Sequence, residues 1–265
     1  MGEKYMNIDR EYIVKQFASY VQAYDDTDSK IKLKIDHTYR VSMLCEQLAR
    51  SEGLSEEDVG LSWLSGMMHD IGRFEQIRRF NTFNDAKSVD HAQFGANLLF
   101  FEGLIRAFVR DDREDALLEK VIRLHNAYRL PEELSEREYV FATILRDADK
   151  IDILKVNVEV PMEEIYNVSL KELKESPITD AVYENFFSEQ ATLRSLKKHP
   201  VDHLIGHISL VYELVYPMSY ELVEKQGYLE KMMNFVSDNE ETNERLEKIR
   251  EKMYEYLAQK HNEKR

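Results

Sequence analysis

The stretch LSGMMHDIGRF, residues 64–74, decides the fold, because it places a histidine and an aspartate side by side where an apolar helix ends. Residues 55–58 read Ser-Glu-Glu-Asp, which resembles a capping box, and they start that helix. Adjacent helical residues point about 100° apart, so His69 and Asp70 can serve one ion only near a helix end. Gly72 is consistent with such an end.

Two further histidines stand on the apolar side of predicted helices. One helix follows the polar run at residues 25–29 and continues to about Arg50, and His37 shares its buried face. Another helix is predicted near residues 115–128, and His125 again falls on its apolar side. A lone histidine in such a position is more often a hydrogen-bonded core residue than a ligand, so neither histidine indicates a site by itself.

A fourth histidine, His91, lies in the first turn of a helix predicted to begin at residues 88–91. Residues 74–87, which precede it, contain charges and aromatics without clear periodicity, and we expect a connecting loop that passes over the site. The apolar stripe of the helix after His91 is predicted to consist of Phe94, Leu98, Phe101 and Ile105.

A carboxylate joins these histidines. Residues 135–138 form a clean capping box for a helix that runs to about Leu154, and Asp149 lies within its aliphatic stripe. An unpaired buried charge is costly or becomes protonated, so Asp149 requires a partner. Asp147 is on the neighbouring flank of the helix and is expected to be solvated.

Each of these side chains is ordinary by itself, but together they are improbable, because each would need its own hydrogen-bond partner in the core. One shared divalent ion satisfies all of them. A ligand set of nitrogen and oxygen without thiolate suits Fe, Mn, Ni, Co or Zn, and the sequence does not choose among these metals or between one ion and two.

Strong helix breakers are scarce, since the 265 residues include only 9 Gly and 5 Pro, and long periodic segments dominate. The predicted fold class is all-α, as one continuous domain over residues 1–265 without linker or repeat. Other helices are expected around residues 9–24, 162–174, 179–193, 202–215, 219–238 and 240–260. The last of these either docks on the body of the protein or pairs with a second subunit in a homodimer.

Three histidines of the second half, His199, His203 and His207, recur every four residues. No cysteine completes a ligand set on that face, and Asp202 is the only adjacent acid. We therefore predict no metal site there, and the second half is expected to supply packing and a pocket wall.

Composition limits the partners and the compartment. The net charge is −14 and the acidic residues are spread along the chain, so binding to long nucleic acid is disfavoured. No run of about 18 uncharged apolar residues occurs, and membrane insertion is not expected. The only cysteine, Cys45, cannot pair within the chain, which fits a cytoplasmic location. A small anionic substrate remains compatible with this charge, because a bound metal inverts the local field.

The order of the candidate ligands resembles that of the HD-domain superfamily of metal-dependent phosphohydrolases. This resemblance rests on His37, the pair His69-Asp70, His91, His125 and Asp149. The run HDIGRF at residues 69–74 is especially similar to the bacterial members. The resemblance covers roughly residues 30–156, the expected metal-binding core, and leaves residues 157–265 as an accessory helical part.

The resemblance implies a first metal site with four ligands: His37, His69, Asp70 and Asp149. A second ion takes His91 and His125, with Asp70 as the bridge. In the alternative with one metal, His91 or His125 acts as general acid, so the implied catalytic residues are Asp70, His91 and His125. Phosphate also needs fixed polar and positive groups, for which the candidates near these ligands are Arg40, Arg73, Lys150 and Asn126.

The implied function is hydrolysis, through a metal-activated hydroxide, of a phosphate ester or anhydride in a nucleotide or other small phosphorylated metabolite. The GYP signature of cyclic-dinucleotide phosphodiesterases is missing after His125, and the Glu-Asp pair of alarmone hydrolases is absent downstream of Asp70. Two alternatives stay open. One is an HD-type di-iron oxygenase similar to inositol oxygenase, and the other is a non-catalytic helical module that metal stabilises.

Overall fold

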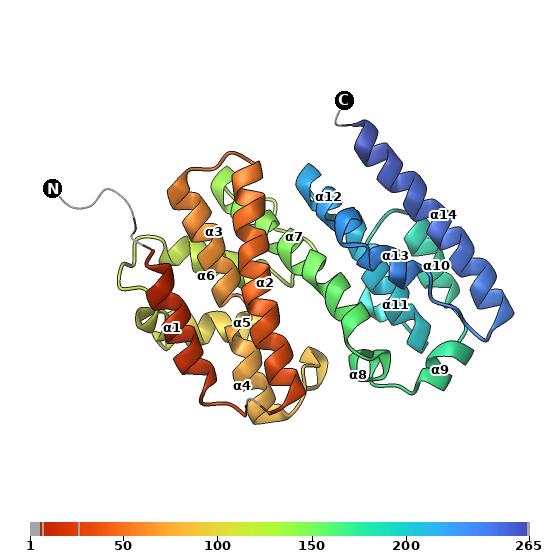
Figure 1. Ribbon diagram of the computed structural model, residues 1–265, viewed down its shortest axis with the longest axis horizontal. Coiled ribbons are helices and arrows are strands. Elements are labelled where there is room, and N and C mark those ends of the chain that lie inside the picture. Colours follow the sequence, from red (N-terminus) through yellow and green to blue (C-terminus); the bar gives the residue numbers. More distant parts are fainter. Residues whose placement is uncertain (1–5, 7, 26, 264–265) are drawn as a thin grey trace. The chain divides into compact units, whose positions relative to one another are not determined.

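The computed structural model describes residues 6, 8–25 and 27–263, and every regular element in that part of the chain is a helix, which confirms the all-α prediction (Figure 1). The chain divides into two compact units, Met1–Ala148 and Asp149–Arg265, and each is described by itself. The expectation of one continuous domain stays a prediction. None of the described helices is both long and apolar enough to cross a membrane.

The helices of the first unit are α1 (Arg10–Val21), α2 (Ser29–Ser51), α3 (Glu56–Met68), α4 (Ile71–Phe80), α5 (His91–Ala96), α6 (Asp115–Leu124) and the first part of α7 (Glu136–Glu159). Several of these helices start at capping residues. The side chains of Asp9 and Ser55 accept backbone N–H groups in the first turns of α1 and α3. Before α7, Ser135 N donates to Glu138 Oε2 at 2.8 Å and Glu138 N donates to Ser135 Oγ at 3.3 Å, which confirms the capping box.

Helices α2 and α3 pack closely because Gly66 stands where they meet. A Cβ atom on Gly66 would lie 2.6 Å from Ser42 Cα and 3.1 Å from Cys45 Sγ, so only glycine allows this approach. Cys45 is buried at this interface as a small apolar residue. Because the meeting point is within about one and a half helical turns of His37 and of His69, it brings these two histidines from different helices together.

The expected loop over residues 74–87 is wrong, because the structure has helix α4 and a 3₁₀ turn at Asp85–Lys87 in this stretch. Helix α4 begins directly after Asp70 and ends at Asn81, whose left-handed backbone (φ 51°) stops it. Its buried face carries three apolar residues spaced three apart: Ile71, Phe74 and Ile77. The break between α3 and α4 therefore spans only His69 and Asp70.

Gly72 does not end a helix but lies in the first turn of α4, where it lets α4 pack against α5. A Cβ atom on Gly72 would lie 2.6 Å from the carbonyl oxygen of His91 and 2.7 Å from the amide nitrogen of Gly95. The close approach of the two helices carries His91 to the break between α3 and α4.

The helix after His91 is less regular than predicted. Helix α5 ends at Ala96, and a π-helical turn follows at Asn97–Phe101. A π turn adds one residue to a helical turn and so displaces the apolar stripe. Leu98 remains buried, but Phe101 is 88% exposed instead of lying on the buried stripe.

The second unit contains the rest of α7 and the helices α8 (Met162–Tyr166), α9 (Leu170–Glu175), α10 (Asp180–Phe187), α11 (Pro200–Ile208), α12 (Pro217–Gln226), α13 (Tyr228–Met233) and α14 (Glu240–Asn262). Two predicted helices are each split in two, where Asn167 (φ 54°) and Gly227 (φ 68°) take the left-handed conformation. Helix α11 packs against α9, α10 and α13. Helix α14 packs against α10, α12 and α13, so it docks on its own unit, and its pairing with a second copy stays a prediction.

Candidate metal centre

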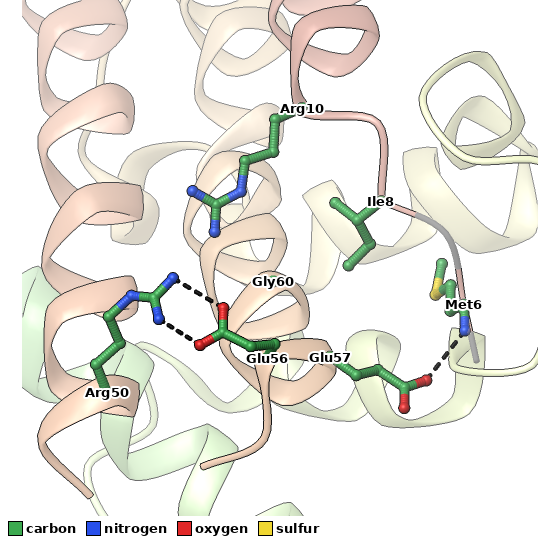
Figure 2. Close-up of a pocket in the computed structure, with 7 residues that line it drawn as sticks. All are labelled: Met6, Ile8, Arg10, Arg50, Glu56, Glu57 and Gly60. Carbon is green, nitrogen blue, oxygen red and sulfur yellow. Dashed lines mark hydrogen bonds and ion pairs between the residues drawn. The ribbon is translucent and has the colours of Figure 1, made fainter. Parts of the chain in front are cut away.

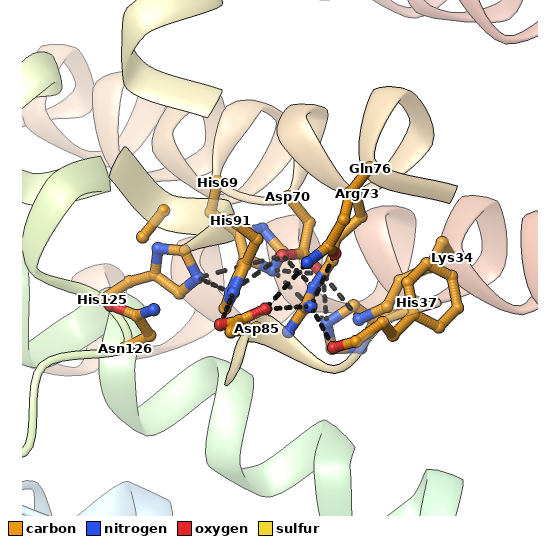
Figure 3. Close-up of polar contacts among 12 residues, drawn as sticks. Lys34, His37, His69, Asp70, Arg73, Gln76, Asp85, His91, His125 and Asn126 are labelled. Atoms are coloured by element: carbon orange, nitrogen blue, oxygen red, sulfur yellow. Dashed lines mark hydrogen bonds and ion pairs between the residues drawn. The ribbon is translucent and has the colours of Figure 1, made fainter. Parts of the chain in front are cut away.

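Five of the six predicted metal ligands meet inside the first unit, and all five are buried (Figure 3). They come from five helices or helix ends: His37 within α2, His69 after the last residue of α3, Asp70 before the first residue of α4, His91 at the start of α5 and His125 after the last residue of α6. Because α3 ends before His69 and α4 begins after Asp70, these adjacent side chains are not held about 100° apart and can reach one site.

His37, His69 and Asp70 form the first half of the cluster. The Nε2 atoms of the two histidines lie 3.3 Å apart. Asp70 Oδ2 lies 3.5 Å from His37 Nε2 and 3.6 Å from His69 Nε2. Two nitrogen or oxygen ligands bound to one divalent ion at about 2.1 Å lie about 3.0 to 3.4 Å apart, so this half fits an ion with minor adjustment.

His91, His125 and the same aspartate form the second half. The Nε2 atoms of His91 and His125 lie 2.9 Å apart. Asp70 Oδ1 lies 3.5 Å from His91 Nε2 and 3.8 Å from His125 Nε2. The two oxygens of Asp70 therefore face two different pairs of imidazoles, which is the arrangement of a carboxylate that bridges two ions.

Hydrogen bonds at the outer side of two rings fix where the imidazole protons lie. His69 Nδ1 lies 2.7 Å from the carbonyl oxygen of Gly66, and His125 Nδ1 lies 2.7 Å from that of Ile122. Because a carbonyl oxygen only accepts, each ring carries a proton on Nδ1, and in the neutral ring Nε2 then has the lone pair. These lone pairs point into the cluster, where a cation would stabilise them, so the donor set fits a metal.

Asp85 is a residue of the centre that sequence reasoning missed. Its Oδ2 accepts from His91 Nδ1 at 2.6 Å, and its Oδ1 accepts from Arg73 at 2.8 Å and Gln76 at 2.9 Å. Burial opposes ionisation of Asp85, but the hydrogen bond from His91 and the charge of Arg73 hold its pKa below the usual range. Burial lowers the pKa of His91 to about 4, so this ring is neutral at pH 7 and is held with Nε2 toward the centre.

Lys34 is the second missed residue, and its Nζ lies 2.7 Å from Asp70 Oδ2. Burial alone would raise the pKa of Asp70, but the charge of Lys34 and the other electrostatic interactions of the centre, that with Arg73 included, hold it well below the usual range. The Lys34 side chain is 18% exposed while that of Asp70 is 3% exposed, so the lysine is the more accessible partner of this ion pair. Lys34 precedes His37 by three residues on α2, and this helical spacing was the signal that could have revealed it.

Arg73, predicted to bind substrate, is engaged by the protein itself. Its Nη1 donates at 2.8 Å to Gln76 Oε1, to the carbonyl oxygen of Phe83 and to Asp85 Oδ1. Its Nε lies 3.7 Å from Asp70 Oδ1, so the guanidinium borders the centre. These bonds tie the segment after α4 to the metal cluster, and the role of Arg73 toward substrate stays a prediction.

The other predicted substrate residues of the first unit have simpler surroundings. Asn126 follows His125, is exposed and donates from Nδ2 to Asp90 Oδ1 at 3.0 Å. Arg40 is half-buried on α2, one turn after His37. Their contact with substrate stays a prediction.

Two predicted residues, Asp149 and Lys150, lie on α7 in the part that belongs to the second unit. Asp149 is half-buried, and Lys150 Nζ lies 3.3 Å from the carboxylate of Glu213 in the same unit. Their assignment to the metal and to the substrate stays a prediction. Asp147 is not solvated as expected but fully buried, because residues 141–148 are all buried and leave this part of the helix no exposed flank.

A surface pocket of the first unit has a different character (Figure 2). It is lined by Met6, Ile8, Arg10, Arg50, Glu56, Glu57 and Gly60. Arg50 is paired with Glu56 at 2.6 Å, and Arg10 is paired with Glu46 at 2.6 Å. The two guanidinium charges of this pocket are thus balanced by glutamates, and the metal cluster remains the candidate site.

The family model of the HD domain matches residues 35–154 of the chain. This range contains all six predicted metal ligands, from His37 to Asp149, and its limits lie close to those expected from the ligand order. Comparison with curated proteins and with solved structures finds no match.

Proposed function

We propose that the chain is a metal-dependent phosphohydrolase of the HD-domain superfamily, because residues 35–154 match the HD-domain family model. Its proposed substrate is a phosphate ester or anhydride of a nucleotide or another small phosphorylated metabolite. The observation that carries the proposal is the position of Asp70, whose two oxygens each face a pair of imidazoles inside the first unit.

The donor set supports an assignment of the metal ligands. We assign His37, His69 and Asp70 to a first ion, with Asp149 as the predicted fourth ligand, and His91, His125 and Asp70 to a second. When bound, such ions supply Lewis acidity toward a phosphoryl oxygen and make water acidic enough to ionise near neutral pH. Iron, manganese, cobalt, nickel and zinc are all compatible with these ligands.

The remaining polar groups of the metal centre hold its ligands in place and supply positive charge. Asp85 holds the His91 ring through its Nδ1 proton, and Arg73 holds Asp85 in turn. The Lys34 ammonium donates one hydrogen bond to Asp70 Oδ2, and its other N–H groups can donate to a phosphate oxygen. Together with Arg40, this lysine provides positive charge for an anionic substrate in a protein whose net charge is −14.

The direct test is a screen of nucleotides and phosphate esters with the full chain and each of several divalent metals. We expect activity in the wild type, loss to background in Asp70→Ala, and near wild-type activity in Asp36→Ala, an exposed aspartate on α2. Equal activity in Asp70→Ala and Asp36→Ala would contradict the assigned site.

Two other outcomes identify the alternatives. A di-iron absorption spectrum in the purified protein, together with consumption of oxygen, would assign the chain to the oxygenases. Retained metal without phosphatase activity in any metal, with stability lost on chelation, would make it a non-catalytic helical module.

The role of His91 separates a centre with two metals from one with a single metal. If His91 binds a second ion, His91→Gln halves the metal content per chain. If His91 is instead a general acid, the same variant keeps its metal and loses turnover. Metal analysis and single-substrate kinetics on one preparation distinguish the two results.

A further inference from the structure

A second group of titratable side chains lies in the second unit and takes no part in the metal centre. Tyr166 ends α8, and its ring stacks on two histidines of α11, His203 at 6.1 Å and 27° and His207 at 5.7 Å and 22° between ring centroids and planes. The Tyr166 hydroxyl donates to Asn157 Oδ1 at 2.9 Å, which fixes the ring. The tyrosine therefore holds both imidazoles on one face of α11.

Lys197 lies across the same face of α11, at Gly206. A Cβ atom on Gly206 would lie 2.2 Å from Lys197 Nζ and 2.5 Å from its Cε, so the lysine tail occupies the space that a side chain would fill. Gly206 is adjacent to His207 and three residues after His203, so the ammonium lies on the helix surface beside the two imidazoles.

This ammonium has no hydrogen bond or ion pair within residues 6, 8–25 and 27–263, the part of the chain that the structure describes. The nearby acid is Asp202, whose carboxylate accepts four hydrogen bonds from other groups. Its Oδ1 accepts from Thr179 N at 3.0 Å, and its Oδ2 accepts from Thr179 Oγ1 at 2.7 Å, Lys198 N at 2.9 Å and His199 N at 2.8 Å. The charge of Asp202 favours the protonated form of Lys197, but no ion pair joins the two among the described residues.

The imidazole of His207 is also incompletely bonded. Its Nδ1 is buried and meets no hydrogen-bond partner among the described residues, which is costly for a polar atom. Burial, with the charges of Lys197 and His203, lowers the pKa of His207 to about 3, and burial together with Arg194 lowers the pKa of Lys197 to about 8. All of these features indicate a group of side chains that lacks a negatively charged partner.

We propose that Lys197, His203 and His207 form a binding site for a small oxyanion, a phosphate group either free or at the end of a small monoester. Lys197 supplies the charge, and the imidazole N–H groups donate to the anion oxygens. Tyr166 positions the two rings. The proposal is independent of the metal centre, because none of these residues belongs to it.

The test is titration of the full chain with inorganic phosphate, followed by calorimetry and by the ring-proton NMR signals of the histidines. We expect a binding event that shifts the His203 and His207 signals and that weakens by about tenfold or more in Lys197→Met, since a charge-assisted bond contributes roughly 1.5–3 kcal/mol. Lys198→Met removes a neighbouring exposed lysine and should leave the binding unchanged. Lys197→Arg, which keeps the charge, should retain most of it.

Phosphate that binds at the metal centre does not obscure the loss of affinity in Lys197→Met, because the Lys197 variants leave that centre intact. A parallel titration with methyl phosphate distinguishes the two sources of the anion. Tighter binding of methyl phosphate indicates a monoester, and tighter binding of inorganic phosphate indicates free phosphate. Unchanged binding in Lys197→Met, an equal loss in Lys198→Met, or a loss in Lys197→Arg as large as in Lys197→Met overturns the proposal. So does phosphate binding that leaves the His203 and His207 signals unmoved.

Discussion

Asp85 controls the orientation of His91, because its carboxylate accepts the Nδ1 proton at 2.6 Å and leaves Nε2 facing the cluster. Replacement by asparagine keeps the shape of the side chain but removes its charge and weakens the bond to Arg73. We expect Asp85→Asn to lower metal affinity at the His91 position by about 10- to 100-fold. Equilibrium dialysis against a competing chelator measures this change.

The control for Asp85 is Asp112→Asn, which alters an exposed aspartate of the same unit and should leave metal affinity unchanged. If Asp85→Asn binds metal as tightly as the control, the carboxylate does not position His91.

Individual ligands were predictable from the sequence where they lie on a helix with clear periodicity. His37 and His125 share apolar faces, and the adjacent pair His69-Asp70 marks a helix end. Asp85 was not predictable, because a 3₁₀ turn brings it to His91 across six residues that show no spacing pattern. Lys34 could have been found, since it precedes His37 by about one helical turn.

The break between α3 and α4 is the element that assembles the centre, and Gly72 allows α5 to pack against it. In Gly72→Ala the new Cβ would meet the backbone of His91 and Gly95 at 2.6 and 2.7 Å. Backbone atoms cannot move aside as a flexible side chain can, so we expect a loss of about 1–3 kcal/mol in the free energy of unfolding. Denaturant titration of the metal-free chain measures it.

Gly60→Ala is the matched control on α3. The nearest atom to its Cβ is Ile8 Cδ1 at 3.4 Å, an ordinary contact, and alanine favours a helix over glycine by about 0.5–1 kcal/mol. We expect this variant to be as stable as the wild type or more stable. A Gly72→Ala protein that matches Gly60→Ala in stability would show that the approach of α4 to α5 is not tight.

Elements with caps and long stripes were predicted well, and short ones were not. Helices α3 and α7 start at their predicted caps. Helix α4 was missed because its three buried apolar residues are separated by Gly72, Arg73, Glu75 and Gln76, so no long stripe forms. The π turn after α5 has no signal in apolar periodicity, and for that reason Phe101 was placed on the wrong face.

For the whole molecule, buried neutral histidines make stability depend on pH. His207 has a folded pKa of about 3, below the value of about 6.5 in the unfolded chain, so the unfolded state binds the proton first as the pH falls. The contribution of His207 to the free energy of unfolding is complete above pH 6.5 and is lost as the pH falls toward 3. The loss between pH 6.5 and 5 is on the order of 2 kcal/mol.

Denaturant titrations at several pH values in buffers without phosphate measure this effect. The loss of stability between pH 6.5 and 5 should be smaller in His207→Gln, which cannot take up the proton. An identical pH dependence in the two proteins would show that His207 is protonated as readily in the folded chain as in the unfolded one.

For the whole molecule, the all-α class followed from the scarcity of Gly and Pro, and the ligand order predicted closely which residues match the HD-domain family model. The division into Met1–Ala148 and Asp149–Arg265 had no such signal, because α7 continues across the boundary without a linker. Asp149 lies at that boundary, and its assignment as a metal ligand rests on the sequence alone.

The central claim is that a metal ion holds the imidazoles together with Asp70. Elemental analysis of the purified full chain, dialysed and then supplied with iron, manganese, cobalt, nickel or zinc, tests it most directly. We predict at least one tightly bound ion per chain in the wild type and in Asp36→Ala, and almost none in Asp70→Ala. A wild-type protein that retains none of these metals, or an Asp70→Ala protein that retains as much as the wild type, would contradict the claim.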